Sequence, residues 1–151
     1  MRSYSLAVCL AAGAILLVAA VDPHTAIPAR QAGMKQIGRT FKGINDQLHA
    51  AAPNAAELKA GTAQLADLAA RLPSWFPAGT GPETGVKTAA KADVWAHPAD
   101  FHAKAAALAG ATRALASAAA TSGNPAVLTP LVAHVGGACK GCHESYRVPE
   151  H

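Results

Sequence analysis

The sequence predicts an all-α protein, an antiparallel four-helix bundle whose helices run up, down, up and down. Of the 151 residues, 39 are alanine and only 5% are aromatic. Alanine is the best helix former, whereas the β-branched and aromatic residues that strands prefer are too sparse for a sheet protein. Four stretches of apolar residues at three-and-four spacing are separated by two short connections and one long one, as in a bundle.

The first predicted helix runs from Thr25, its N-cap, to about Ala52. Its apolar positions are Ile27, Met34, Ile37, Phe41, Ile44 and Leu48. Pro53 breaks this pattern, and Asn54 is available as the N-cap of a second helix, which Pro73 ends. The apolar face of the second helix comprises Leu58, Leu65, Leu68 and Leu72.

A long connection over 73–88 contains prolines and glycines without helical periodicity. Connections of this length in compact domains are usually functional or fold over the surface. A short helical turn is expected over 91–96, and Pro98 suits the first position of a third helix. The inward positions of this third helix are Phe101, Ala105, Leu108, Thr112, Leu115 and Ala119.

The fourth predicted helix begins at Pro125, with Asn124 as its N-cap, and runs to about Arg147. Pro130 lies inside this stretch. Because proline lacks a backbone N–H and crowds the preceding turn, it predicts a kink or a late start near Thr129.

The first 20 residues are typical of a secretory signal peptide, with Arg2 followed by an uncharged apolar stretch over 6–18 and small residues up to Ala20. The apolar stretch is shorter than the roughly 20 residues that span a bilayer. We therefore expect a signal peptide over 1–20, a periplasmic domain over 21–151 and no stable membrane span after cleavage. An uncleaved membrane anchor is the alternative.

The formal charge of +4 says little about partners, because the basic residues are scattered along the chain. No run of lysine or arginine is interleaved with aromatic residues, so we expect no nucleic-acid binding.

One segment indicates a specific chemistry, namely Cys139-Lys140-Gly141-Cys142-His143. In this pattern the two thiols add to the vinyl groups of a haem, and the histidine is placed to bind the iron. Positions 139, 142 and 143 share one face of a helix, so the three side chains can act together. The sequence thus predicts one covalent haem c, attached through Cys139 and Cys142 with His143 as an axial iron ligand.

The cysteine pair has three alternative interpretations. A zinc site would need further ligands, and the sequence has no second cysteine pair. A thioredoxin-like dithiol would need a βαβ context, which a helical chain does not offer. A simple disulfide suits an exported chain but leaves His143 unexplained.

Met34 is the candidate for a second axial ligand, since the other methionine is Met1. A methionine on an apolar helix face is more often core filler than a ligand. An iron held by His143 alone would keep an open face, however, and a His/Met pair is a standard electron-transfer ligation.

Together these segments resemble the cytochrome c′ family, the class II c-type cytochromes, which are four-helix bundles. The resemblance spans essentially the whole mature chain. It rests on Arg30-Gln31-Ala32-Gly33-Met34-Lys35 with Ile37-Gly38, on Phe76-Pro77-Ala78-Gly79-Thr80-Gly81 with Lys87-Thr88 and Val94-Trp95, and on Gly137 to Arg147 around the cysteine motif.

The resemblance implies that the first helix crosses the face of the haem opposite His143, where position 34 divides the family. High-spin members carry a non-coordinating residue there, whereas low-spin members of the cytochrome c-556 type carry methionine. Met34 therefore suggests the c-556 type. Arg30 and Gln31 match positions that approach the haem propionates, which a guanidinium suits through paired charged hydrogen bonds.

We expect a one-electron carrier with His/Met ligation, which exchanges electrons with redox partner proteins and has no catalytic residue. The alternative is a five-coordinate cytochrome c′ that binds nitric oxide or carbon monoxide at the distal face. The resemblance also allows a homodimer. The alanine-rich composition fits both functions, because small residues leave a flat slot in which a haem supplies the apolar area of the core.

Overall fold

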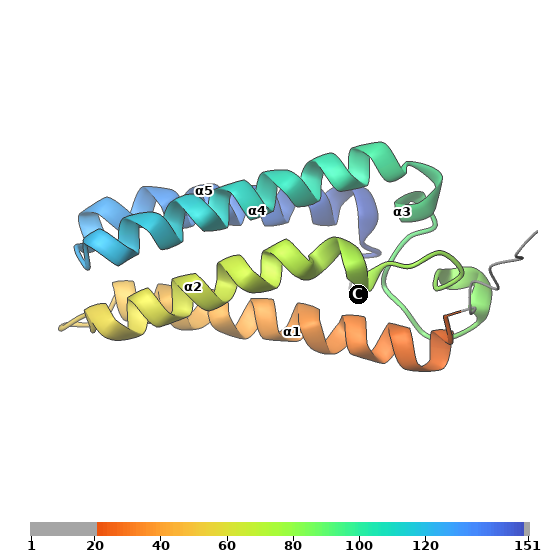
Figure 1. Cartoon of the computed structure of the whole chain (residues 1–151), viewed down its shortest axis with the longest axis horizontal. Coiled ribbons are helices and arrows are strands. Elements are labelled where there is room, and N and C mark those ends of the chain that lie inside the picture. Colours follow the sequence, from red (N-terminus) through yellow and green to blue (C-terminus); the bar gives the residue numbers. More distant parts are fainter. Residues whose placement is uncertain (1–20, 150–151) are drawn as a thin grey trace, which may run out of the picture.

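The structure, a computed structural model, describes residues 21–149, and four long helices form a bundle (Figure 1). They are α1 (Pro23–Leu48), α2 (Ala55–Arg71), α4 (Pro98–Thr121) and α5 (Pro125–Tyr146). The expected signal peptide over 1–20 lies outside the described residues. The signal and the boundary of the mature domain therefore stay predictions.

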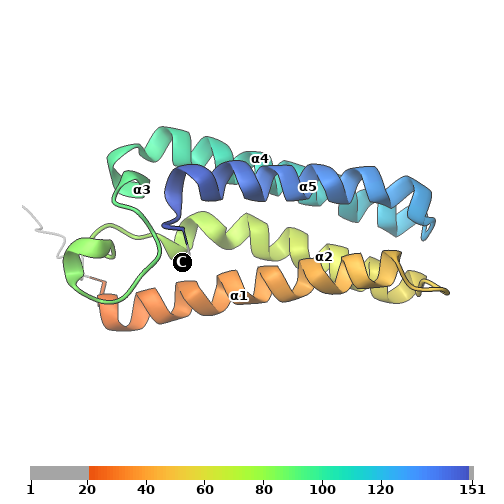
Figure 2. The same cartoon turned by 180° about the vertical axis from the view of Figure 1, so that it is seen from behind.

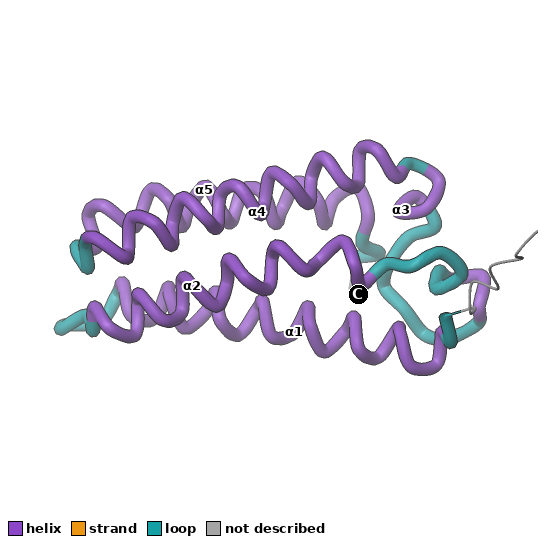
Figure 3. The backbone as a smooth tube through the Cα atoms, viewed as in Figure 1, coloured by secondary structure: helices purple, strands orange, loops and turns teal. Residues whose placement is uncertain are grey.

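Successive long helices run in opposite directions, so the predicted up-down-up-down bundle is confirmed (Figures 1 and 2). α1 packs along α2, α2 along α4, and α4 along α5, whereas α1 and α5 touch at few points. The described residues contain no strand, and loops gather at the two ends of the bundle (Figure 3). The side between α1 and α5 is thus the most loosely packed of the four.

Side-chain caps set the helix starts. Asn54 accepts hydrogen bonds from the N–H groups of Ala56 and Glu57, and Asn124 accepts one from Ala126, as the sequence predicts for N-caps. For α1 the expected cap was wrong. Asp22 rather than Thr25 accepts the bond, at 3.0 Å from the N–H of His24, and α1 therefore begins three residues earlier.

The other boundaries depart from expectation in two places. α1 ends at Leu48 rather than near Ala52, and α5 starts at Pro125 without the late start that Pro130 suggested. Pro28 and Pro130 both lie inside helices, five residues after a proline in the first turn. An exposed proline so near a helix start removes one backbone hydrogen bond without ending the helix.

The core lies between the four helices and is mostly aliphatic. All the inward positions predicted for α4 are buried, from Phe101 to Ala119. Ile37 and Ile44 of α1 pack into the same cluster as Leu58 and Leu65 of α2. In the described part of the chain, no helix is both long and apolar enough to cross a membrane.

The long connection between α2 and α4 contains three short helical segments, η1 (Leu72–Trp75), η2 (Pro82–Thr84) and α3 (Asp93–Ala96). The turn expected over 91–96 corresponds to α3, whereas the sequence pattern missed η1 and η2. Residues 76–91 cross the end of the bundle between η1 and α3, and this segment is called the strap below. Figure 2 shows it running from the side of α1 to that of α5.

Candidate haem-binding site

Cys139 and Cys142 lie in the last turns of α5, partly buried against the hydrophobic core. Both are free thiols, so the disulfide that the sequence left open is not formed. Burial raises the pKa of each thiol. Both cysteines are therefore protonated at neutral pH, one helical turn apart, on the side of α5 that adjoins the core.

His143 follows Cys142 directly and is exposed near the end of α5. Partial burial of its ring lowers the pKa of His143, and the positive charge of Arg147 lowers it further. The imidazole is thus neutral at neutral pH and keeps a nitrogen lone pair, which is the form that binds a metal.

Phe41 and Gly136 fix the register between α1 and α5. A Cβ at Gly136 would lie 3.7 Å from Cζ of Phe41. The two helices are antiparallel. Met34 precedes Phe41 by seven residues, and His143 follows Gly136 by seven, so each pair is separated by about two turns, or about 10.5 Å, along its helix. Because seven residues return almost to the same helix face, Met34 and His143 lie level on facing sides of the two helices.

Met34 is partly buried and packs against the hydrophobic core. Its neighbour Gly33 lies under the indole ring of Trp75, because a Cβ at Gly33 would lie only 2.8 Å from Cη2 and Cζ3 of that ring. The sequence pattern did not predict this contact between α1 and η1. The inner face of α1 therefore carries Met34 beside a tightly packed tryptophan.

Arg30, one turn before Met34, is buried and binds the strap. Its Nη1 donates to Oγ1 of Thr80 at 3.2 Å, and its Nη2 donates to the Thr80 carbonyl at 3.1 Å and to Oγ1 of Thr88 at 2.9 Å. The guanidinium also lies 4.7 Å from the ring centroid of Phe76 and 5.5 Å from that of Trp95. Burial lowers the pKa of Arg30, although Glu83 partly opposes the shift.

Gln31 also binds the strap, since its side-chain Nε2 donates to the Lys87 carbonyl at 2.9 Å. Arg30 and Gln31 thus both hold the connection against α1. Their expected role at the haem propionates stays a prediction, and the sequence did not indicate that Thr80 and Thr88 would receive the guanidinium.

The other end of the strap is bound to α5. The backbone N–H of Lys91 donates to the Tyr146 carbonyl at 2.9 Å, and that of Val148 donates to the Ala89 carbonyl at 2.8 Å. An isolated antiparallel bridge joins Ala90 and Arg147 between these bonds. The strap therefore links the helix that carries Met34 to the helix that carries His143.

Tyr146 closes α5 against α4. Its hydroxyl donates to Oδ2 of Asp100 at 2.5 Å, and its ring stands edge-on to Phe101 with the centroids 5.4 Å apart. The hydrogen bond to Asp100 raises the pKa of Tyr146 to about 12, with burial adding to the shift. Sequence reasoning missed Asp100 because 46 residues separate the two partners.

A family model described as Cytochrome C′ matches residues 25–147. The chain belongs to the cytochrome c′ family. The cytochrome c′ of Pararhodospirillum photometricum is 36% identical over 127 residues, which cover 83% of this chain and 98% of the relative. The resemblance seen in the sequence is thus confirmed for the family.

Solved structures of the family have the same fold. A cytochrome c′ described as having an unusual ligand-controlled dimer dissociation matches with a TM-score of 0.79 and 32% identity, covering 87% of this chain and 100% of its own. A nitric oxide complex of a leucine-to-isoleucine variant of cytochrome c′ from Alcaligenes xylosoxidans matches with a TM-score of 0.75 and 28% identity, covering 84% and 97%. A dimer of this chain stays a prediction.

As a cytochrome c′, this chain binds one covalent haem c. The residues present fit that group, because α5 offers two protonated thiols and a neutral imidazole on one face, beside the core and next to the loosely packed side of the bundle. A bare metal ion is a poorer fit. In the part of the chain that the structure describes, no three histidine, cysteine or acidic side chains gather to hold one.

The cytochrome c-556 subtype finds no support in these relatives, which are all described as cytochromes c′. The expectation drawn from Met34 rested on one residue, whereas the family match covers the whole bundle. A methionine at this position can fill space in an apolar core without donating its sulfur to iron. Met34 alone therefore does not decide the subtype.

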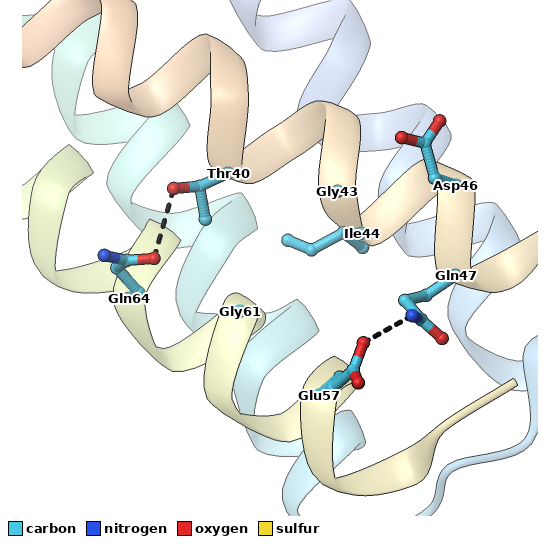
Figure 4. Close-up of a pocket in the computed structure, with 8 residues that line it drawn as sticks. All are labelled: Thr40, Gly43, Ile44, Asp46, Gln47, Glu57, Gly61 and Gln64. Atoms are coloured by element: carbon cyan, nitrogen blue, oxygen red, sulfur yellow. Dashed lines mark hydrogen bonds between the residues drawn. The ribbon is translucent and has the colours of Figure 1, made fainter.

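A groove lies elsewhere, on the seam between α1 and α2 (Figure 4). Its walls are held together by hydrogen bonds from Oγ1 of Thr40 to Oε1 of Gln64, at 3.2 Å, and from Gln47 to Glu57. None of the cysteine or histidine side chains of the haem motif lines it. The groove is a surface feature of the helix pair and is separate from the haem site.

Proposed function

We propose that this chain is a periplasmic cytochrome c′ whose ferrous haem binds nitric oxide or carbon monoxide on the side that faces α1. Cys139 and Cys142 would hold the haem through thioether bonds, and His143 would bind the iron from the side of α5. When bound, the haem supplies an iron that changes by one electron and accepts a diatomic gas. No residue is assigned a catalytic role.

The packing of Met34 supports this proposal. Its side chain lies level with His143 but packs against the hydrophobic core, as a residue that lines an apolar pocket does. An apolar lining excludes water and polar ligands while it admits small neutral gases. The nitric oxide complex of the Alcaligenes xylosoxidans relative favours the same function.

An electron carrier with His143 and Met34 as permanent ligands is the second candidate. The level positions of the two residues favour it, because a His/Met pair needs one ligand from each side of the haem plane. In that protein both ligands would stay bound in both redox states, and the carrier would exchange single electrons with partner proteins.

The absorption spectrum of the exported protein separates these functions. We expect a high-spin ferric spectrum, ready binding of carbon monoxide by the ferrous form, and little change in either when Met34 is replaced by leucine, which conserves its volume. A low-spin spectrum that carbon monoxide leaves unchanged, and that becomes high-spin and gas-sensitive in Met34→Leu, would establish the carrier instead. If no covalent haem formed in the presence of a cytochrome maturation system, both functions would be wrong.

A further inference from the structure

We propose that five lysines around the open side between α1 and α5 form a docking surface for an acidic redox protein that reduces the haem iron. They are Lys35 and Lys42 of α1, Lys87 and Lys91 of the strap, and Lys140 of α5, and are called the lysine rim. This inference rests on the proposed haem site, because it concerns how electrons reach that site.

The contacts of α1 place two of these lysines away from α2. Thr40 bonds to Gln64 of α2, and a Cβ at Gly61 of α2 would lie 3.2 Å from Cγ1 of Ile44. At 100° per residue, Lys35 and Lys42 point to roughly the opposite side of α1 from Thr40. Phe41, which contacts α5, lies about 100° around the helix from Thr40, so both lysines lie on the exposed outer face of α1, nearer to its edge beside α5 than to its edge beside α2.

The strap and α5 complete the rim. Gln31, one turn before Lys35, bonds to the carbonyl of Lys87, and this contact brings the strap beside Lys35. On α5, Gly136 contacts α1 and Lys140 follows one turn later on the same side. The ammonium group of Lys91 donates to the Glu144 carbonyl at 3.1 Å, which fixes it at the end of α5.

Positive charge exceeds negative charge on this rim. Lys42 pairs with Asp46 and Lys140 with Glu144, but the side chains of these lysines remain 75% and 78% exposed, so water screens both pairs. Among the described residues, no carboxylate lies within ion-pair distance of Lys35 or Lys87. The exposed face of α2, by contrast, balances Lys59 and Arg71 against Glu57 and Asp67.

A positive rim at the haem edge would attract a negatively charged donor and orient it there. Carbon monoxide binds ferrous iron, so the ferric protein must first be reduced. In that step one electron passes from the reduced donor to the ferric iron, and no atom or proton is exchanged. Complementary charge raises the association rate of such short-lived complexes, most strongly at low ionic strength.

The test measures reduction of the ferric holoprotein by reduced plant-type ferredoxin, an acidic one-electron donor, in a stopped-flow instrument. The rim variant is Lys35→Glu with Lys87→Glu. The matched control is Lys59→Glu with Arg113→Glu, which changes the net charge equally on exposed positions of α2 and α4. None of these residues belongs to the proposed haem site.

At about 10 mM salt we expect the rim variant to react at least about threefold more slowly than the control, with the difference lost near 0.5 M salt. With hexaammineruthenium(II), a cationic donor, the rim variant should instead react faster than the control. Equal slowing of the two variants would mean that only net charge acts, and the rim would be rejected.

Two further measurements separate the remaining outcomes. The carbon monoxide spectrum of each variant reports on the proposed gas-binding site, so a normal spectrum with unchanged ferredoxin kinetics would overturn the docking surface alone. Sedimentation with phosphatidylglycerol vesicles tests a lipid surface. Vesicle binding that the rim variant loses, without any effect on the ferredoxin rate, would also overturn the proposal.

Discussion

Gly33 is the position where α1 approaches the indole ring of Trp75 most closely. A side chain there would lie 2.8 Å from two ring carbons, which is nearer than carbon atoms pack. Trp75 of η1 is partly buried and packs against the core beside α1 and the end of α2, so displacing its ring would lose packing contacts. Because glycine has no side chain, Gly33 allows α1 to approach η1 this closely.

We expect Gly33→Ala to lower the free energy of unfolding by about 1 to 3 kcal/mol through overpacking. The matched control is Gly43→Ala in the same helix, where a Cβ would meet nothing within 4 Å. That change should raise the free energy of unfolding by roughly 0.5 to 1 kcal/mol, because alanine is the better helix former. Guanidinium unfolding of the holoprotein measures both, and equal effects would show that the indole contact is unimportant.

Residues that act through their immediate neighbours were predictable from the sequence. Asn54 and Asn124 cap helices because a side-chain oxygen one or two residues ahead of a helix accepts its first free N–H groups, wherever the helix lies. The cysteine motif is likewise local. The guanidinium of Arg30 binds residues 50 and 58 positions away, and such a pairing depends on the path of the whole connection.

At the level of elements, too, features set by local sequence were predictable, whereas the strap, which depends on distant contacts, was not. The four long helices follow from their apolar spacing, whereas η1 and η2 are too short to have a period. What orders residues 76–91 is their attachment at both ends, to Arg30 and Gln31 on one side and to the end of α5 on the other. The ordered conformation of the strap depends on tertiary contacts, which the secondary-structure propensities of its residues do not encode.

Arg30→Gln should therefore loosen the strap and lower the free energy of unfolding by about 2 to 3 kcal/mol, since hydrogen bonds to a buried charged donor are lost. Limited proteolysis should show new cleavage within residues 76–91. Arg39→Gln is the control, because Arg39 is exposed and, among the described residues, donates a hydrogen bond to Gln36 of its own helix, at 2.6 Å. Its effect should stay within about 0.5 kcal/mol, and similar losses in both variants would contradict the role of Arg30.

At the scale of the whole molecule, residues 21–149 form three closely packed helix seams and one loose one. Alanine contributes little apolar area, so the side between α1 and α5 has few side chains that could fill it. A haem held on α5 would supply that missing area. The composition of the sequence pointed to an incomplete core, and the loose seam shows where the core is incomplete.

Without haem the chain should be poorly folded. We expect protein produced without a maturation system to show a broad, non-cooperative thermal transition, whereas the haem-loaded chain should melt sharply. Differential scanning calorimetry and gel filtration of the two forms measure this difference. A compact haem-free form with a sharp calorimetric transition would mean that the alanine-rich helices pack well enough by themselves.

The order of the helices also bears on how the bundle forms. The seams of α1 with α2 and of α4 with α5 join helices linked by short loops, whereas the seam of α2 with α4 closes the long connection. Contacts across short loops have low contact order and form rapidly. Bringing α1 and α5 together instead joins the two ends of the domain, and this step carries the largest loop-closure entropy. The strap, anchored to both helices, divides that large loop into two smaller ones.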